Sequence, residues 1–301
     1  MKTMGRYRLD AVEGSGAFAT VWRGFDTELE TPVAIKVLAD NWSHHADVRE
    51  RFLQEARLLR AVNDPRVVRV HDVGVHDDRP YFVMDHVAGG TLHDVADGRL
   101  AEDQALELAE QACRAVAALH AAGVLHRDVK PSNLLVDRRD DGSTHVLVAD
   151  LGSAKRLAEA SGITVTTGTP AYMSPEQALG RPIDERTDVY ALGVALFVLL
   201  TGSPPFDGQN TATTAMRSTT DRPQGLSGPL DEVVARATAY EADDRHLSAT
   251  ALADDLRTVR LGGRPASPLT PASGLPLWWL VALAVVVFGA SAAATWFVLG
   301  L

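Results

Sequence analysis

The hydrophobic pattern of this 301-residue chain changes once, and that change restricts the fold more than any other feature. Up to about Pro80 the apolar residues form short runs typical of β-strands, interrupted by one helical stretch. Beyond about Ala101 their spacing becomes mainly helical. Strands followed by helices predict an α+β fold, with a small sheet-rich lobe and a larger helical lobe.

The composition supports a buried core and argues against several classes of protein. With 46% hydrophobic residues, the chain has enough apolar material for one large domain or two smaller ones. Its net charge of -10 lacks the basic excess that neutralises phosphates, so no nucleic acid is expected as a partner. The single cysteine, Cys113, excludes an internal disulfide and a cysteine-based zinc cluster, which suits a reducing cytosol.

Residues 277–301 contain no charged side chain. At 1.5 Å per residue, about 25 residues give a helix of roughly 37 Å, which exceeds the ~30 Å hydrocarbon core of a bilayer. Trp278, Trp279 and Trp296 near its ends are placed like interfacial aromatic residues. We therefore expect one C-terminal transmembrane helix with the lipid bilayer as a partner; a buried core helix is the alternative.

The residues before this segment predict its orientation. Residues 1–10 lack the apolar run of a secretory signal, and basic residues precede the segment on one side only. These basic residues are Arg257, Arg260 and Arg264. The pattern predicts a single-pass protein of the cell membrane with a cytoplasmic N-terminal domain and its C-terminus at the outer face. Residues 262–276, rich in Pro, Gly and Ser, read as a linker, so the expected domains are 1–261, 262–276 and 277–301.

Residues 14–21 read GSGAFATV and form a glycine-rich turn between two strand-like runs. Glycines there let backbone amides approach phosphate oxygens closely. An ordinary hairpin turn is the alternative.

The next strand-like run carries a lysine in apolar surroundings. Alternation places Lys36 on one face of the strand with Ala34 and Leu38, and a buried lysine needs an anionic partner. Glu55 lies on the apolar stripe of the following helix and can supply the charge. We expect a Lys36–Glu55 ion pair that positions the lysine against nucleotide phosphates; a purely structural pair is the alternative.

Residues 124–136 read VLHRDVKPSNLLV and follow a helix that ends at Gly123. This string resembles the catalytic loop of Hanks-type protein kinases, whose H-R-D-x-x-x-x-N spacing it matches residue for residue. The resemblance covers about residues 7–261 and implies a two-lobed protein-kinase fold of the bacterial, eukaryotic-like Ser/Thr type. It implies that Asp128 accepts the substrate hydroxyl proton, Lys130 contacts the γ-phosphate and His126 is a packed structural residue.

Other segments extend the resemblance. Residues 148–152, VADLG, are similar to the D-F-G element, residues 81–87, YFVMDHV, to the hinge, and residues 168–176, GTPAYMSPE, to the end of the activation segment. In the family an aspartate in the place of Asp188 braces the catalytic loop, and an arginine in the place of Arg245 pairs with Glu176. The implied site residues are Lys36, Glu55, Asp128, Lys130 and Thr169 for catalysis, Gly14, Ser15, Gly16, Val21, Ala34, Lys36, Met84, Asp85 and Val87 for ATP, and Asn133 and Asp150 for Mg²⁺, with Mn²⁺ as a substitute.

The function implied is transfer of the γ-phosphoryl group of Mg-ATP to serine or threonine of protein substrates in signal transduction. Two departures from the family pattern, Ala19 for the third loop glycine and Leu151 for phenylalanine, leave open a pseudokinase scaffold that binds nucleotide without turnover. A small-molecule phosphotransferase is a third interpretation, against which the peptide-holding segment 169–176 argues.

Arg127, immediately before Asp128, predicts activation by autophosphorylation, because an arginine there lacks a partner until a phosphate is supplied. Thr169 is excluded as an acceptor, because its hydroxyl serves catalysis in the family. The candidate phosphorylation sites are Thr164, Thr166 and Thr167, with ordinary loop threonines as the alternative. Small residues in the last segment offer a face for a homodimer, although such residues are common in any transmembrane helix. They are Gly289, Ala290, Ala293 and Ala294.

Overall fold

The small lobe is built on a six-stranded antiparallel sheet. The structure, a computed structural model, describes residues 2–96, 98–139, 141–151, 170–206 and 210–266. The strands lie in the order β1-β2-β3-β4-β6-β5. Their bounds are β1 (Lys2–Met4), β2 (Tyr7–Ser15), β3 (Ala19–Asp26), β4 (Thr31–Leu38), β5 (Val70–His76) and β6 (Arg79–Asp85). Neighbours in sequence are neighbours in the sheet except at β4, which pairs with β6, so short turns connect most of the sheet.

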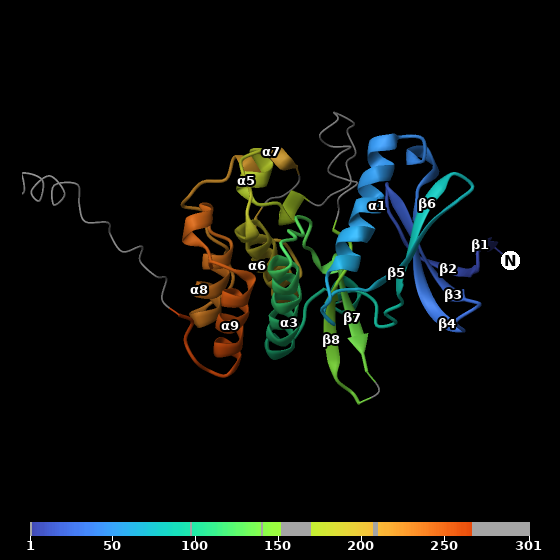
Figure 1. Ribbon diagram of the computed structural model, residues 1–301. Helices are drawn as coiled ribbons and strands as arrows, with labels where there is room; N and C mark the ends of the chain where they lie inside the picture. Colours follow the sequence, from blue (N-terminus) through green and yellow to red (C-terminus); the bar gives the residue numbers. More distant parts are fainter. Residues whose placement is uncertain (1, 97, 140, 152–169, 207–209, 267–301) are drawn as a thin grey trace, which may run out of the picture. The chain divides into compact units, whose positions relative to one another are not determined.

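The two faces of β4 lie in different parts of the core, as the alternation in the sequence predicts. Val33, Ile35 and Val37 pack in a cluster on one face, whereas Ala34 and Leu38 belong to the main core. Helix α1 (Ala46–Ala61) packs against β5 and β6 on the side that faces the large lobe (Figure 1). A short 3₁₀ turn, η1 (Asp40–Trp42), leads from β4 toward it.

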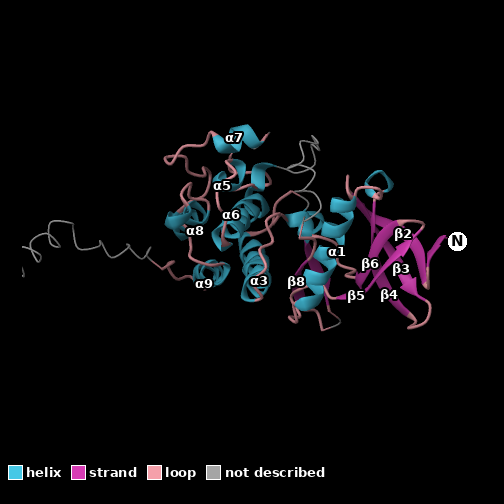
Figure 2. Cartoon of the chain, turned by 45° about the horizontal axis from the view of Figure 1, so that its top comes forward, coloured by secondary structure: helices cyan, strands magenta, loops and turns pink. Residues whose placement is uncertain are grey.

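The large lobe is mainly helical (Figure 2). Its longest helix, α3, packs against α6 and α9, and the hairpin of β7 and β8 lies beside it. The helices described are α2 (Leu92–Ala96), α3 (Glu102–Ala121), α5 (Pro175–Ala178), α6 (Glu185–Thr201), α7 (Thr211–Ala215), α8 (Gly228–Ala237) and α9 (Ala249–Arg260). The hairpin strands are β7 (Leu134–Arg138) and β8 (Thr144–Val148), and the 3₁₀ turns are η2 (Pro131–Asn133), η3 (Pro170–Tyr172) and η4 (Ala242–Asp244). The predicted two-lobed α+β architecture is confirmed.

Helix α6 is the central element of the large lobe and is buried over most of its length. Asp184 accepts a hydrogen bond from the Arg186 amide and caps its N-terminus. A Cβ on Gly193 would lie 2.7 Å from the Cβ of Ala237, so only glycine allows α8 to approach α6 this closely. Because α6 packs against α3, α8 and α9, residues in its first turns are rigid anchors for the loops of the site.

No helix in the part of the chain that the structure describes is long and apolar enough to cross a membrane. The predicted transmembrane segment 277–301, with its three tryptophans and small residues, lies outside the described residues. So does most of the predicted linker 262–276, and one compact unit of the chain ends at Pro265. The membrane span therefore stays a prediction. Cys113 is buried on α3, and burial raises the pKa of its thiol.

Candidate active site

Lys36 on β4 reaches two carboxylates from different segments. Its Nζ lies 2.7 Å from Glu55 Oε1 on α1 and 3.0 Å from Asp150 Oδ1, which follows β8. Burial disfavours the charged lysine, but Asp150 and Glu55 outweigh it and raise the pKa of Lys36. The expected Lys36–Glu55 pair is present, and the lysine is a fixed cation at the junction of the lobes.

Asp128 lies on the loop between α3 and β7, with two side chains of the same loop directed at it. Lys130 Nζ is 3.1 Å from Asp128 Oδ2. Asn133 Nδ2 donates to the Asp128 carbonyl oxygen at 2.8 Å and to its Oδ2 at 3.2 Å. One carboxylate oxygen of Asp128 is therefore oriented by a cation and an amide, which is the arrangement that a proton-accepting carboxylate needs.

The Asp188 carboxylate on α6 holds this loop, as the family resemblance implies. It accepts hydrogen bonds from the backbone amides of His126 at 2.8 Å and Arg127 at 2.7 Å. One of its oxygens also lies 2.8 Å from His120 Nε2. Burial would raise the pKa of Asp188, but the hydrogen bond with His120, the electrostatic interaction with His126 and the hydrogen bond from the Arg127 amide lower it. His126 is fully buried, with Nε2 3.1 Å from the Ala149 carbonyl oxygen, so it packs as a structural residue.

The side chains of Asp150 and Asn133 carry oxygen atoms that could hold a divalent metal. Asp150 has a positive φ of 54° and a side chain that is 41% exposed, while Leu151 after it is buried. Asn133 is linked to this strand end, because its carbonyl oxygen accepts the Ala149 amide at 3.1 Å. A carboxylate and an amide oxygen are hard ligands of the kind that Mg²⁺ prefers, so the residues present fit that ion.

The predicted nucleotide-contacting residues lie on adjacent strands of the small lobe. Gly14 and Ser15 end β2, Gly16 follows, and Val21 on β3 pairs with Lys36 in the sheet register. Ala34 on β4 pairs with Met84 on β6, which is 7% exposed. Asp85 and Val87 lie at and just beyond the end of β6, with the Asp85 amide donating to the Arg69 carbonyl oxygen at 3.1 Å. These residues therefore come from four neighbouring strands, β2, β3, β4 and β6, and from the positions directly after β2 and β6.

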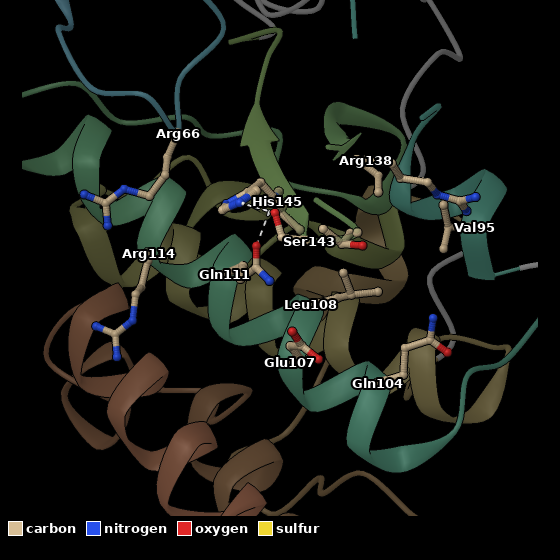
Figure 3. Close-up of a pocket in the computed structure, with 14 residues that line it drawn as sticks. Arg66, Val95, Gln104, Glu107, Leu108, Gln111, Arg114, Arg138, Ser143 and His145 are labelled. Carbon is tan, nitrogen blue, oxygen red and sulfur yellow. Dashed lines mark hydrogen bonds between the residues drawn. The ribbon is translucent and has the colours of Figure 1, made fainter. Parts of the chain in front are cut away.

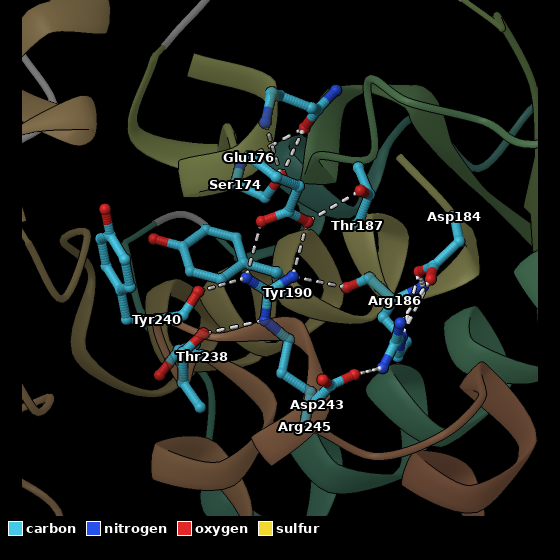
Figure 4. A network of polar contacts seen from close by, with 12 residues as sticks. Ser174, Glu176, Asp184, Arg186, Thr187, Tyr190, Thr238, Tyr240, Asp243 and Arg245 are labelled. Atoms are coloured by element: carbon cyan, nitrogen blue, oxygen red, sulfur yellow. Dashed lines mark hydrogen bonds and ion pairs between the residues drawn. The ribbon is translucent and has the colours of Figure 1, made fainter. Parts of the chain in front are cut away.

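Arg245 and Glu176 form a buried ion pair in the large lobe (Figure 4). The two guanidinium nitrogens contact the two carboxylate oxygens at 2.7 and 2.8 Å. Burial would raise the pKa of Glu176, but the hydrogen bonds and charge of Arg245 hold it below the usual range. This is the pair that the family resemblance implies.

Ser174 has a role that the sequence analysis missed. It caps α5 in a reciprocal capping box with Gln177, and the Gln177 side-chain amide donates to the Arg127 carbonyl oxygen at 3.0 Å. The spacing of Ser174 and Gln177 is the sequence signature of such a box and would have revealed the cap. The cap connects the segment after residue 170 to the catalytic loop.

Several predicted residues lie outside the described part of the chain. They are Gly152, Thr164, Thr166, Thr167, Gly168 and Thr169. Arg127, which was expected to lack a partner, has a positive φ of 67°, and within the described residues its Nε has no hydrogen-bond partner. Its expected role with a phosphate stays a prediction.

A separate cavity of about 820 Å³ lies between α3 and the β7–β8 hairpin (Figure 3). None of the predicted site residues lines it. Two of its arginines are already neutralised, Arg66 by Asp64 and Arg114 by Glu110 and Asp254. We therefore assign no ligand to this cavity.

Comparison with known proteins agrees with the geometry of the site. Residues 7–258 match the protein kinase domain model. The chain is 36% identical over 279 residues to the serine/threonine-protein kinase PknB of Mycobacterium leprae, covering 87% of this chain and 44% of that protein. It is 37% identical over 265 residues to the serine/threonine-protein kinase PknL of Mycobacterium tuberculosis, covering 84% and 65%. The crystal structure of the Mycobacterium tuberculosis PknI kinase domain is similar, with a TM-score of 0.66 and 27% identity over 85% of this chain and 97% of that one.

The two-lobed fold and the site residues together are those of a protein kinase domain. The chain belongs to the protein kinase family, and the relatives named above are Ser/Thr protein kinases of bacteria. It spans less than half the length of the PknB relative. The family implies ATP, a divalent metal and protein substrates.

Proposed function

We propose that this protein is a Ser/Thr protein kinase that transfers the γ-phosphoryl group of Mg-ATP to protein serine or threonine. The observation that carries the proposal is the position of Lys36, whose Nζ forms ion pairs with both Glu55 and Asp150. A pseudokinase scaffold would not need this bridge together with Asp128 and Asn133. The relatives described as Ser/Thr kinases support the same reading.

The residues of the site account for the chemistry in separate steps. Lys36, held by Glu55, presents a fixed positive charge to the nucleotide phosphates. When bound, Mg-ATP supplies the phosphoryl group and a metal charge that neutralises its oxygens, with Asn133 and Asp150 as the residues that would hold the metal.

Asp128 orients the substrate hydroxyl and accepts its proton. Lys130, 3.1 Å from Asp128, places a second cation where negative charge develops on the transferred group. The carboxylate is already oriented by Asn133, so little reorganisation precedes the proton transfer.

The test is the identity of the phosphorylated residue. The full chain, incubated with γ-labelled radioactive ATP, Mg²⁺ and a generic basic protein, should yield labelled phosphoserine and phosphothreonine but no phosphotyrosine. Absence of label from a chain that binds ATP would favour the scaffold instead.

We further propose that the protein is anchored in the cell membrane by residues 277–301, with the kinase domain in the cytoplasm and the C-terminus at the outer face. The uncharged run, its flanking tryptophans and the arginines on its N-terminal side support this. Anchoring confines copies of the kinase to one surface and raises their effective concentration. A homodimer through the small residues of that segment would act in the same direction.

Activation is proposed to proceed by autophosphorylation of the activation segment. A phosphate on Thr164, Thr166 or Thr167 would supply the anion that Arg127 needs. The support is the arginine's position, directly before Asp128, with an Nε that has no partner among the described residues. The Arg127 carbonyl oxygen accepts a hydrogen bond from the Gln177 side chain. Binding of a phosphate by Arg127 would therefore act directly on the catalytic loop.

A further inference from the structure

The tip of the glycine-rich loop is attached to a tryptophan from another segment. Trp42, the last residue of η1, donates a hydrogen bond from its indole Nε1 to the Ala17 carbonyl oxygen at 2.8 Å. Its ring stacks on Phe18, with centroids 5.0 Å apart and planes 24° from parallel. Both rings are largely buried, at 6% and 9% exposed. A stacked, largely buried pair of rings with a part-buried hydrogen bond beside it is a specific attachment.

Backbone contacts strengthen the same attachment. The Ala39 amide, between β4 and η1, donates to the Phe18 carbonyl oxygen at 2.8 Å. Within the loop, the Gly16 amide donates to the Ala19 carbonyl oxygen at 2.9 Å and closes the turn. Three hydrogen bonds and one ring stack thus restrain a loop whose glycines would otherwise leave it flexible.

The base of the loop is held independently. Glu13, the residue before Gly14, contacts His86 in the hinge, with Oε1 and Nε2 2.8 Å apart. The histidine side chain is 12% exposed and the glutamate side chain 38% exposed. The base of the loop is thus joined to the hinge through Glu13, whereas Trp42 contacts Ala17 and Phe18 at the tip. Trp42 therefore restrains the tip of the loop.

We propose that Trp42 is a positioning residue for ATP, which holds the glycine-rich loop in the conformation that the nucleotide phosphates require. The inference rests on the proposed function, since it assumes that the loop receives ATP. Trp42 acts through Ala17 and Phe18, and it lies on the connection that leads to α1, the helix of Glu55. A loop ordered before binding loses less conformational entropy when the nucleotide binds, so the affinity for nucleotide is higher.

The test compares Trp42→Phe, which removes the indole hydrogen bond and keeps an aromatic ring, with the matched control Trp22→Phe. Trp22 lies on β3 and packs with the cluster on the other face of the sheet. In the full chain without nucleotide, Trp42→Phe should speed amide hydrogen exchange of residues 14–20 by about 2- to 10-fold, the effect of one lost hydrogen bond. The dissociation constant for ADP and the KM for ATP should rise by a similar factor of about 2–10, with kcat within about twofold.

Three results would overturn the inference. Unchanged loop exchange and ADP affinity in Trp42→Phe would show that the contact does not position the loop. Faster exchange in α3 and α6 as well would show that Trp42 only stabilises the fold. Equal effects of Trp22→Phe on loop exchange and ADP affinity would show that the effects of Trp42→Phe are not specific to its contact with the loop. A wild-type chain that binds no ADP would count against the proposed function, whereas the exchange data of the nucleotide-free protein would still test the attachment.

Discussion

Breaking the buried pair of Arg245 and Glu176 should destabilise the kinase domain strongly. The Arg245 side chain is fully buried, and that of Glu176 is 12% exposed. In Glu176→Gln the guanidinium loses its counter-charge but stays buried among the carbonyl oxygens of Ala239, Tyr240 and Arg186. Removing one partner of such a pair costs about 3–5 kcal/mol of unfolding free energy. For a domain of this size that is a fall in Tm of about 6–20 °C.

Urea and thermal unfolding of the full chain measure this effect. Glu50→Gln is the matched control, because Glu50 pairs with Arg57 on the exposed surface of α1 and its loss should change the unfolding free energy little. If Glu176→Gln were no more destabilising than Glu50→Gln at pH 7, the buried pair would not hold the domain together as described.

The same variant has a defined pH dependence. The pKa of Glu176 is lowered in the folded state from its ordinary value of 4.5. As the pH falls below that value, the unfolded chain therefore binds more protons than the folded chain. The stabilisation is complete above about pH 4.5 and is lost as the pH falls through the lowered pKa. Unfolding free energies of wild type and Glu176→Gln should therefore approach each other in acid. A constant difference in unfolding free energy between wild type and Glu176→Gln from pH 7 to pH 3 would contradict this pH dependence.

Three further predictions follow from the site and the sequence. Lys36→Met leaves Glu55 and Asp150 without their shared cation, so steady-state phosphoryl transfer should fall by roughly 10²-fold or more; turnover within tenfold of wild type would contradict that role. The full chain should sediment with membranes and resist carbonate extraction, and external protease on spheroplasts should spare the kinase domain; digestion of that domain would refute the orientation. Mass spectrometry after incubation with Mg-ATP should find phosphate on Thr164, Thr166 or Thr167, and replacing all three by alanine should reduce activity; unchanged activity would end the activation proposal.

The sequence predicted the contacts that regular patterns determine. Strand alternation put Lys36 on a buried face, and the apolar stripe of the next helix put Glu55 beside it, as the 2.7 Å ion pair confirms. The family spacing placed Asp188 beneath the catalytic loop and Arg245 beside Glu176, and both contacts are present. The two-lobed fold and the family are confirmed as well.

The contacts that sequence analysis missed join segments with no shared periodicity. Trp42 contacts Ala17 across 25 positions, and His86 contacts Glu13 across 73, so neither pair lies on one helix face or one strand. Both depend on how a loop folds against a neighbouring element, which only the assembled lobe determines. A charged residue before Gly14 and a tryptophan after β4 give no local signal of their partners.

The most direct test of the central claim compares phosphoryl transfer by the wild-type chain and by Asp128→Asn. Asparagine keeps the shape of the side chain beside Lys130 and Asn133 but removes the proton acceptor. The kinase account predicts that kcat falls on the order of 10²-fold or more while the affinity for ADP is retained. Undiminished turnover by Asp128→Asn would contradict the account, because the assigned base would then have no role in the reaction.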